Sequence, residues 1–424
     1  MPGTPLGILD LVPISSGSTA AGALRNSIDL ARHAERLGYT RYWFAEHHLN
    51  PGVAGTSPAV VLALTASATT TIRLGSGAVQ LGHRTALSTV EEFGLVDALH
   101  PGRLDLGLGR SGGPGRGAAG ERPAGTEPGP GRRAQEDAGA QSRKRPAGAA
   151  LPGQRVSGAG PAGEPSGRVP VVDGRAPNGL LIPPPFSFEA VLESPRFALQ
   201  RGLLQLPGAR PPEYAGQIDD VLALLAGTYR SADGEEAHVV PGEGADIEVW
   251  ILGSSGGESA EAAGARGLRF AANYHVSPAS VLDAVAAYRQ HFTPSATLHR
   301  PYVTVSADVV VAEDEAHARE LATGYPLWVR SIRTAEGAIP YPTPEEARAH
   351  TWTDEDRALV QDRVDTQLVG TAPQVADRLE QLRQATQADE LLVTTITHAH
   401  PDRVRSYRLL AQEWTRRGHS ALRP

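Results

Sequence analysis

IRLGSGAVQLGHRTALSTVEEFGLVDALHPGRLDLGLGR occupies residues 72–110 and holds a strand, a helix and a second strand in that order. The first run, Ile72–Leu81, and the last run, Arg103–Arg110, are short and mostly apolar, which is typical of strands buried inside a sheet. Ser88–Leu99 lies between them and shows the apolar spacing of a helix. Two strands joined through a helix run parallel, so this stretch predicts a parallel sheet covered by helices.

The same alternation continues on both sides of this unit. The eight expected strands are Leu6–Pro13, Arg41–Glu46, Ile72–Leu81, Arg103–Arg110, Glu248–Ser255, Arg269–Val276, Tyr302–Ala312 and Glu390–His398. The expected helices are Thr19–Gly38, Ser57–Thr69, Ser88–Leu99, Tyr214–Ala226, Ser259–Gly267, Pro278–His291, Pro373–Gln384 and Asp402–Arg416. Eight strand–helix units that close on themselves form an α/β fold, the (β/α)8 TIM barrel. A doubly wound open sheet is the alternative. We expect residues 1–424 to form one such barrel domain.

One segment interrupts the expected barrel after its fourth strand. Residues 111–170 contain 15 of the 47 Gly and 9 of the 34 Pro, and they lack Phe, Trp, Tyr, Ile and Met. Such a segment buries too little apolar area to offset the entropy lost on ordering it. We therefore expect residues 111–170 to be disordered, within a low-complexity insertion, rich in Gly, Pro, Ala and Arg, that spans residues 111–178. A natural loop and a compensated reading-frame error in a GC-rich gene both explain this composition.

The composition excludes several classes of function. The chain has no Cys, which excludes disulfides, iron–sulfur clusters and thiol catalysis, and its only Lys, Lys144, is not in a Walker A motif. The net charge of −7 argues against a nucleic-acid partner, because such binding needs cationic groups. The sequence contains no run of about 20 apolar residues, so no membrane span is predicted. The N-terminus lacks the pattern of a signal peptide. We therefore expect a cytoplasmic protein.

The ends of the expected strands hold small and polar residues, and in a TIM barrel the functional residues lie at the carboxyl ends of the strands. These residues are Glu46-His47-His48, Gly77-Ala78-Val79-Gln80, Gly109-Arg110, Ser254-Ser255-Gly256, Asn273 with His275, and Thr397-His398 with His400. We expect them to surround one mouth, where Gln80, Asn273 and His275 are candidate substrate contacts.

Two adjacent histidines, His47 and His48, allow three interpretations. A general base is one, because histidine titrates near neutral pH. A metal site is another, but it needs further ligands, and successive residues of a strand point to opposite sides; we predict no metal. In the structural interpretation, one histidine caps the barrel rim and the other is hydrogen-bonded in the core.

Two clusters of small residues suggest close contact with a ligand. Residues 253–257, Gly-Ser-Ser-Gly-Gly, lead into a helix with Ser259 in its first turn, and such a helix start suits a phosphate. Arg110, on the neighbouring strand, would supply a positive charge there; an ordinary serine N-cap is the alternative. Gly77 and Ala78 would let a flat ligand approach the backbone, although tight packing explains them equally well.

With these residues assembled, the chain resembles the bacterial luciferase-like family of flavin-dependent monooxygenases. The segments that carry the resemblance are residues 30–48 (LARHAERLGYTRYWFAEHH), 71–112, 250–268 and 368–382. The resemblance implies a barrel that binds reduced FMN, delivered by a separate flavin reductase in a two-component system. It also implies that O2 reacts to give a flavin C4a-hydroperoxide, and that the protein is a homodimer.

The resemblance assigns roles to individual residues. The family's catalytic histidine falls on His47, and the cysteine that precedes the arginine in luciferases is replaced by Gly109, so light emission is not expected. A non-proline cis peptide beside the flavin ring falls on Gly77-Ala78. The implied cofactor-binding residues are Gly77, Ala78, Arg110, Ser254, Ser255, Gly256 and Ser259.

We therefore expect an FMNH2- and O2-dependent monooxygenase that oxidises a small organic substrate. Three alternatives remain: an F420-dependent oxidoreductase on the same barrel, a flavin-binding relative without catalytic turnover, and a damaged, inactive paralogue.

Overall fold

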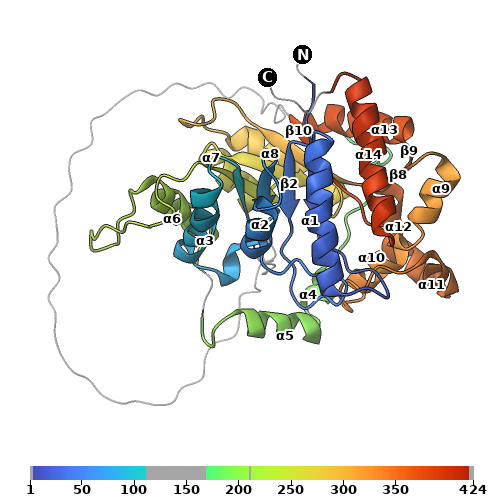
Figure 1. Ribbon diagram of the computed structural model, residues 1–424, viewed down its shortest axis with the longest axis horizontal. Helices are drawn as coiled ribbons and strands as arrows, with labels where there is room; N and C mark the ends of the chain where they lie inside the picture. Colours follow the sequence, from blue (N-terminus) through green and yellow to red (C-terminus); the bar gives the residue numbers. More distant parts are fainter. Residues whose placement is uncertain (1–2, 111–168, 210–211, 420–424) are drawn as a thin grey trace, which may run out of the picture. The chain divides into compact units, whose positions relative to one another are not determined.

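The computed structural model describes residues 3–110, 169–209 and 212–419 (Figure 1). Most of the predicted insertion at 111–178 therefore lies outside the described residues. The part of it that is described, from residue 169 onward, leads into a turn in which Val172 and Arg175 exchange backbone hydrogen bonds. The side chains of Ala176, Leu180 and Ile182 are buried after this turn.

Eight parallel strands form a closed barrel. They are β1 (Leu6–Asp10), β2 (Arg41–Phe44), β3 (Arg73–Ser76), β5 (Leu104–Gly109), β6 (Ile247–Gly253), β7 (Arg269–Asn273), β8 (Val303–Ala312) and β10 (Glu390–Thr394). Each strand pairs with the next in this order, and β10 pairs with both β8 and β1, which closes the sheet. The predicted (β/α)8 fold and all eight predicted strands are confirmed.

The predicted helices are also present. They are α1 (Ala20–Arg36), α2 (Pro58–Ala66), α3 (Ala86–Leu99), α6 (Tyr214–Ala226), α7 (Glu258–Ala265), α8 (Val281–His291), α13 (Ala372–Thr386) and α14 (His400–Arg416). Local sequence explains where several of them begin: the Thr19 and Thr85 side chains accept hydrogen bonds from backbone N–H groups in the first turns of α1 and α3. None of the described helices has the length and apolar character that crossing a membrane requires.

Several elements were not predicted. They are the short strands β4 (Val79–Gln80) and β9 (Leu368–Thr371), and the helices α4 (Glu189–Leu192), α5 (Pro195–Leu204), α9 (Glu315–Leu321), α10 (Tyr325–Arg333), α11 (Pro344–Ala349) and α12 (Asp354–Thr366). β9 pairs with the second half of β8, over Val309–Ala312, because β8 runs on past the point where β10 leaves it. The predicted strand Ile72–Leu81 is divided into two strands, β3 and β4, with Gly77 and Ala78 between them.

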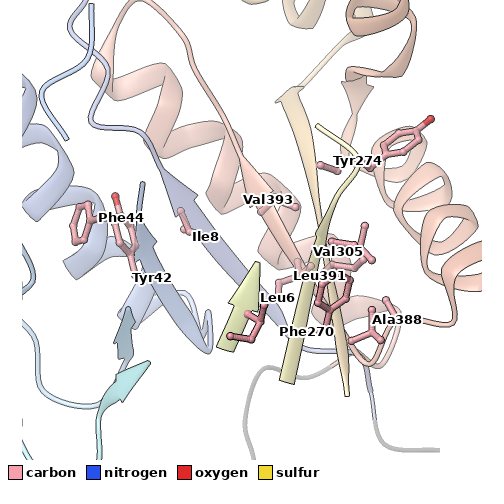
Figure 2. Packing of buried hydrophobic residues seen from close by; sticks show 14 of the residues in the cluster. Leu6, Ile8, Tyr42, Phe44, Phe270, Tyr274, Val305, Ala388, Leu391 and Val393 are labelled. Atoms are coloured by element: carbon pink, nitrogen blue, oxygen red, sulfur yellow. The ribbon is translucent and has the colours of Figure 1, made fainter. Parts of the chain in front are cut away.

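Successive side chains of a strand point to opposite sides of the barrel, and in β1, β2 and β10 they alternate between two apolar clusters. Outward side chains pack against the helices, and Figure 2 shows Tyr42 and Phe44 of β2 among them. Inward side chains, such as Leu9, Trp43 and Leu392, belong to a second cluster inside the barrel. Because the outward side chains pack against the helices, the inward side chains determine what the barrel can bind.

A buried polar network fills the amino-terminal end of the barrel. Arg41, which is 1% exposed, donates hydrogen bonds to the carboxylates of Asp105 at 2.7 Å, Glu248 at 3.0 Å and Glu390 at 2.9 Å. Burial alone would lower the pKa of this guanidinium, but the three carboxylates raise it well above its ordinary value. With this end filled, space for a ligand remains at the carboxyl ends of the strands.

Candidate active site

A cavity of about 500 Å³ opens at the carboxyl ends of the barrel strands. Most of the predicted site residues meet around it. Those that line the cavity are His47, Gly77, Ala78, Gln80, Arg110, Ser254, Asn273 and His275. Ser255, Gly256 and Ser259 do not line it, but they follow Ser254 directly into α7. His398 and His400, also at a strand end, do not line it; His398 Nε2 is 3.0 Å from the carbonyl oxygen of Ser16 and His400 Nε2 is 2.8 Å from Asp29.

The two adjacent histidines have separate environments. His47 lines the cavity, whereas His48 does not, and its Nε2 atom lies 2.9 Å from Glu46 Oε1. The pKa of His47 is lowered to about 4, mainly by burial and in part by the neighbouring His48, while Glu46 acts in the opposite direction. His47 is therefore neutral at pH 7, and its ring can accept a proton from a group in the cavity.

Glu46 is the centre of a buried cluster behind His47. Its Oε1 atom lies 3.0 Å from His83 Nε2 and accepts a hydrogen bond from Arg84 Nη2 at 3.1 Å. Glu46, His48 and His83 offer three potential metal-ligand atoms within 4.8 Å of one another. The Arg84 guanidinium, however, already places a cation on the same carboxylate oxygen, so the cluster is electrostatically balanced by the protein itself.

The predicted small residues allow close packing on one wall of the cavity. The Gly77–Ala78 peptide bond is cis. A Cβ atom added to Gly77 would lie 2.7 Å from Leu9 Cδ1, and one added to Gly109 would lie 3.0 Å from the Cβ of Ala78. A larger side chain at Gly77 would therefore require Leu9 to shift, and one at Gly109 would press against Ala78, so this wall is closely packed around small residues.

The corner next to α7 has the features of an anion site. Arg110 Nη1 lies 2.6 Å from Oε2 of Glu258, the first residue of the helix. The residue that caps the helix is Gly257, and no side chain caps its first turn. The alternative of an ordinary serine N-cap is therefore wrong. Gly256 is needed because α8 passes close by: an added Cβ would lie 3.0 Å from the carbonyl oxygen of Asp283.

Tyr214, at the start of α6, extends this corner and was missed in the sequence. Its hydroxyl group donates to the carbonyl oxygen of Leu108 at 3.3 Å and also interacts with the Ser259 side chain. Burial raises the pKa of Tyr214 above its ordinary value, so it stays a neutral hydrogen-bonding group. A tyrosine at a helix start gives no recognisable signal in a single sequence.

The three predicted substrate contacts are held in place by the barrel. His275 Nδ1 lies 2.6 Å from Ser306 Oγ, and burial lowers the pKa of His275 to about 4. Asn273 Oδ1 accepts a hydrogen bond from the backbone of Ser277 at 3.1 Å. Gln80 Nε2 donates to the carbonyl oxygen of Glu46 at 2.7 Å. Each polar group is thus fixed at the cavity wall by a partner behind it.

The outer part of the cavity, which comes from α4, α5 and α10, was not predicted from the sequence. One face of α5 lines it with Arg196, Phe197, Gln200, Arg201 and Leu204, at helical spacing. α10 adds Trp328, Val329, Ile332 and Arg333. The signal for α5 was present: Ser194-Pro195 is a typical helix start, and the Ser194 side chain accepts a hydrogen bond from the backbone of Phe197.

Comparison with known proteins identifies relatives over nearly the whole chain. The family described as luciferase-like monooxygenase matches residues 4–137 and 207–389. A protein of Escherichia coli K12 named luciferase-like monooxygenase is 30% identical over 408 residues, which are 95% of this chain and 94% of that protein. The crystal structure of apo-MsnO8 is 26% identical, covers 97% of this chain and 98% of its own, and superposes with a TM-score of 0.69.

Two more distant structures share the fold alone. One is the oxygenating constituent of 3,6-diketocamphane monooxygenase, from a plasmid of Pseudomonas putida, in complex with FMN; it is 15% identical, with a TM-score of 0.56 over 97% of both chains. The other is an F420-dependent secondary alcohol dehydrogenase, 10% identical, with a TM-score of 0.54 over 97% of this chain and 99% of its own. The family match and the full-length relatives agree with the resemblance seen in the sequence and confirm the expected enzyme class: the chain belongs to the luciferase-like monooxygenase family of flavin-dependent monooxygenases.

Proposed function

We propose that the enzyme binds reduced FMN at the carboxyl ends of the barrel strands and uses it with O2 to oxidise a small organic substrate. The observation that carries this proposal is the arrangement of three features around one cavity: the neutral His47, the small-residue wall at Gly77 and Ala78, and the anion corner of Arg110 and α7. A flat ring with a phosphate at one end fits the wall and the anion corner, and His47 adds a group that can hold or accept a proton beside the ring.

The described residues fit such a cofactor. The uncapped first turn of α7 offers backbone N–H groups to a phosphate, and Arg110 supplies the opposite charge. Ser254, Ser255 and Ser259 would add hydroxyl donors, and Gly256 keeps the backbone close. Gly77 and Ala78 would lie against the ring because their wall presents no large side chain.

The chain's own groups would control the reaction in the cavity. When bound, reduced FMN supplies the electrons that activate O2, through the flavin C4a-hydroperoxide that the family resemblance implies. His47 would hold or accept a proton at its ring nitrogen, and Gln80, Asn273 and His275 would orient the substrate. Apolar side chains such as Leu11 and Trp328 would keep water out of the cavity.

Two partners complete the proposal. A separate reductase would supply the reduced FMN, because the family resemblance implies a two-component system. The enzyme would also form a homodimer. Leu64 of α2 and Leu95 and Leu99 of α3 are 53%, 58% and 78% exposed, and these two helices pack side by side. Exposed leucines on adjacent helices form the kind of apolar surface that a second copy would bury.

Titration with both candidate cofactors tests the proposal. FMN and F420 are added separately to the purified protein, and binding is followed by the change in cofactor fluorescence. We expect saturable binding of FMN that Arg110→Gln weakens. Binding of F420 but not of FMN would overturn the proposal in favour of an F420-dependent oxidoreductase, whose fold a solved relative shares.

A further inference from the structure

The cavity lining is rich in arginine, and most of these arginines have a carboxylate partner. Arg110 is paired with Glu258, Arg333 with Asp362 and Arg363 with Asp308. The only two carboxylates among the lining residues, Glu46 and Asp308, are themselves engaged with Arg84 and Arg363. The charges of Arg333, Arg363, Glu46 and Asp308 are thus neutralised within the protein, whereas Arg110 lies at the corner proposed for the cofactor phosphate.

Two other lining arginines, both on α5, are different. Among the described residues, no carboxylate lies within ion-pair distance of Arg196 or Arg201. Arg196 Nη2 donates to two neutral acceptors, the carbonyl oxygen of Leu49 and, at 3.2 Å, the Oδ1 atom of Asn50. The Arg201 guanidinium lies over the Phe197 ring, 5.4 Å from its centre. Two positive charges on one helix face the cavity without an anion.

The surroundings of these charges are apolar. Phe197 and Leu204 lie on the same face of α5, and Trp328, Val329 and Ile332 of α10 line the cavity with them. Arg201 is exposed and Arg196 is half-buried, so both guanidinium groups are accessible to a ligand in the cavity. A guanidinium binds a carboxylate or phosphate through two parallel hydrogen bonds. The site therefore favours a ligand with an apolar body and an anionic end.

We propose that Arg196 and Arg201 recognise an anionic group, a carboxylate, on the substrate, whose apolar body lies between α5 and α10. This inference rests on the proposed function for the identity of the cavity as the substrate site. It assigns the substrate class, an organic acid with a carbon chain or ring. Arg196 is fixed over the loop after β2, whereas the phosphate corner lies at β5 and α7, so the two anions have separate sites.

Matched pairs of acids and amides test this inference. The probes are 4-fluorophenyl derivatives of acetate, propanoate and butanoate, each with its primary amide, and binding to the FMN-loaded protein is measured by 19F NMR line broadening. We expect at least one acid to bind about 10-fold more tightly than its amide, which corresponds to one charge-assisted hydrogen-bonded pair. Arg201→Gln should remove this preference, and Arg201→Lys should keep part of it.

Arg201 is the better site for substitution because Arg196 also holds the loop at Leu49 and Asn50. Arg408→Gln is the matched control, since Arg408 is an exposed arginine on α14 that does not line the cavity; this variant should keep the full preference. Equal binding of acids and amides by the wild type, or an unchanged preference in Arg201→Gln, would refute the inference.

FMN affinity, measured on the same samples, separates this inference from the proposed function. If FMN binds the wild type and Arg201→Gln equally while the acid preference is lost, both stand. If the wild type does not bind FMN, the proposed function fails, and with it the inference that rests on it. If Arg201→Gln weakens FMN as much as Arg110→Gln does, Arg201 belongs to the phosphate site and the substrate inference alone is wrong.

Discussion

Arg110 Nη1 and Glu258 Oε2 lie 2.6 Å apart, and this ion pair joins the end of β5 to the first residue of α7. Both side chains are partly exposed, at 38% and 40%. A phosphate that enters this corner meets an arginine already engaged with a carboxylate. Glu258 is therefore a competitor for the charge that we expect to hold the cofactor.

The first prediction concerns FMN affinity. Arg110→Gln should weaken FMN binding about 10- to 100-fold because it removes a charge-assisted hydrogen bond to the phosphate. Glu258→Gln should strengthen binding several-fold because it removes the competing carboxylate. Fluorescence titration of FMN with each variant measures both effects. Unchanged affinity in Arg110→Gln would show that the phosphate is held elsewhere.

The second prediction concerns His47. His47→Ala should slow substrate oxidation by about 10²- to 10⁴-fold, the usual contribution of a general acid or base. FMN affinity should stay within about twofold of the wild type. Single-turnover kinetics give the rate, and FMN titration gives the affinity. His400→Ala is the control, because His400 contacts Asp29 and does not line the cavity; an equal loss of rate in both variants would argue against a special role for His47.

The third prediction concerns pH. Burial lowers the pKa of His47 and His275 to about 4 in the folded protein, and the ordinary value of 6.5 applies to the unfolded chain. Between these two pH values the unfolded chain binds more protons than the folded protein. The free energy of unfolding should therefore be highest, as far as these histidines are concerned, above about pH 6.5 and should decrease as the pH falls toward 4.

NMR titration of the histidine ring protons tests the third prediction directly. Resonances lost in His47→Ala and His275→Ala identify the two rings. Both should titrate at about 4, and the free energy of unfolding, measured with urea, should decrease from pH 6.5 to pH 5. A ring that titrates near 6.5 would mean that it is charged at mildly acidic pH and is not shielded from water.

The fourth prediction concerns the closed end of the barrel. Arg41→Met should lower the free energy of unfolding by about 3–5 kcal/mol because it leaves the buried Glu390 without its cation and removes one cation from Asp105 and Glu248. Asp105 keeps its pair with Arg73, and Glu248 keeps its longer contacts with Arg73 and Arg269. Arg300→Met, which breaks an exposed pair with Asp389, should change it by less than about 1 kcal/mol. Urea denaturation measures both. If Arg41→Met changes the free energy of unfolding as little as Arg300→Met does, Arg73 and Arg269 compensate for the loss of Arg41.

The barrel could be predicted because its signal is local. Each strand is a short apolar run, and some of the following helices begin at a residue, such as Thr19 or Thr85, whose side chain caps the first turn. Strand ends then placed His47, Arg110 and Ser254 at one mouth, since the topology of the barrel leaves them no other position.

The outer wall of the cavity could not be predicted in the same way. α5 has no buried residue and follows a proline-rich stretch, so its apolar spacing is weak. Its role depends on contacts with residues far away in the sequence, such as that of Arg196 with Leu49. The pairing of Arg110 with Glu258, 148 residues apart, is also invisible until the strands are placed side by side.

The reaction of the reduced-FMN complex with O2 tests the central claim most directly. The protein is loaded anaerobically with reduced FMN and mixed rapidly with oxygenated buffer, and the absorbance is followed until oxidised FMN has formed. We expect a long-lived species that precedes oxidised FMN, and its decay should change when substrate is present. Immediate formation of oxidised FMN, at the rate of free reduced FMN and without any effect of substrate, would contradict it.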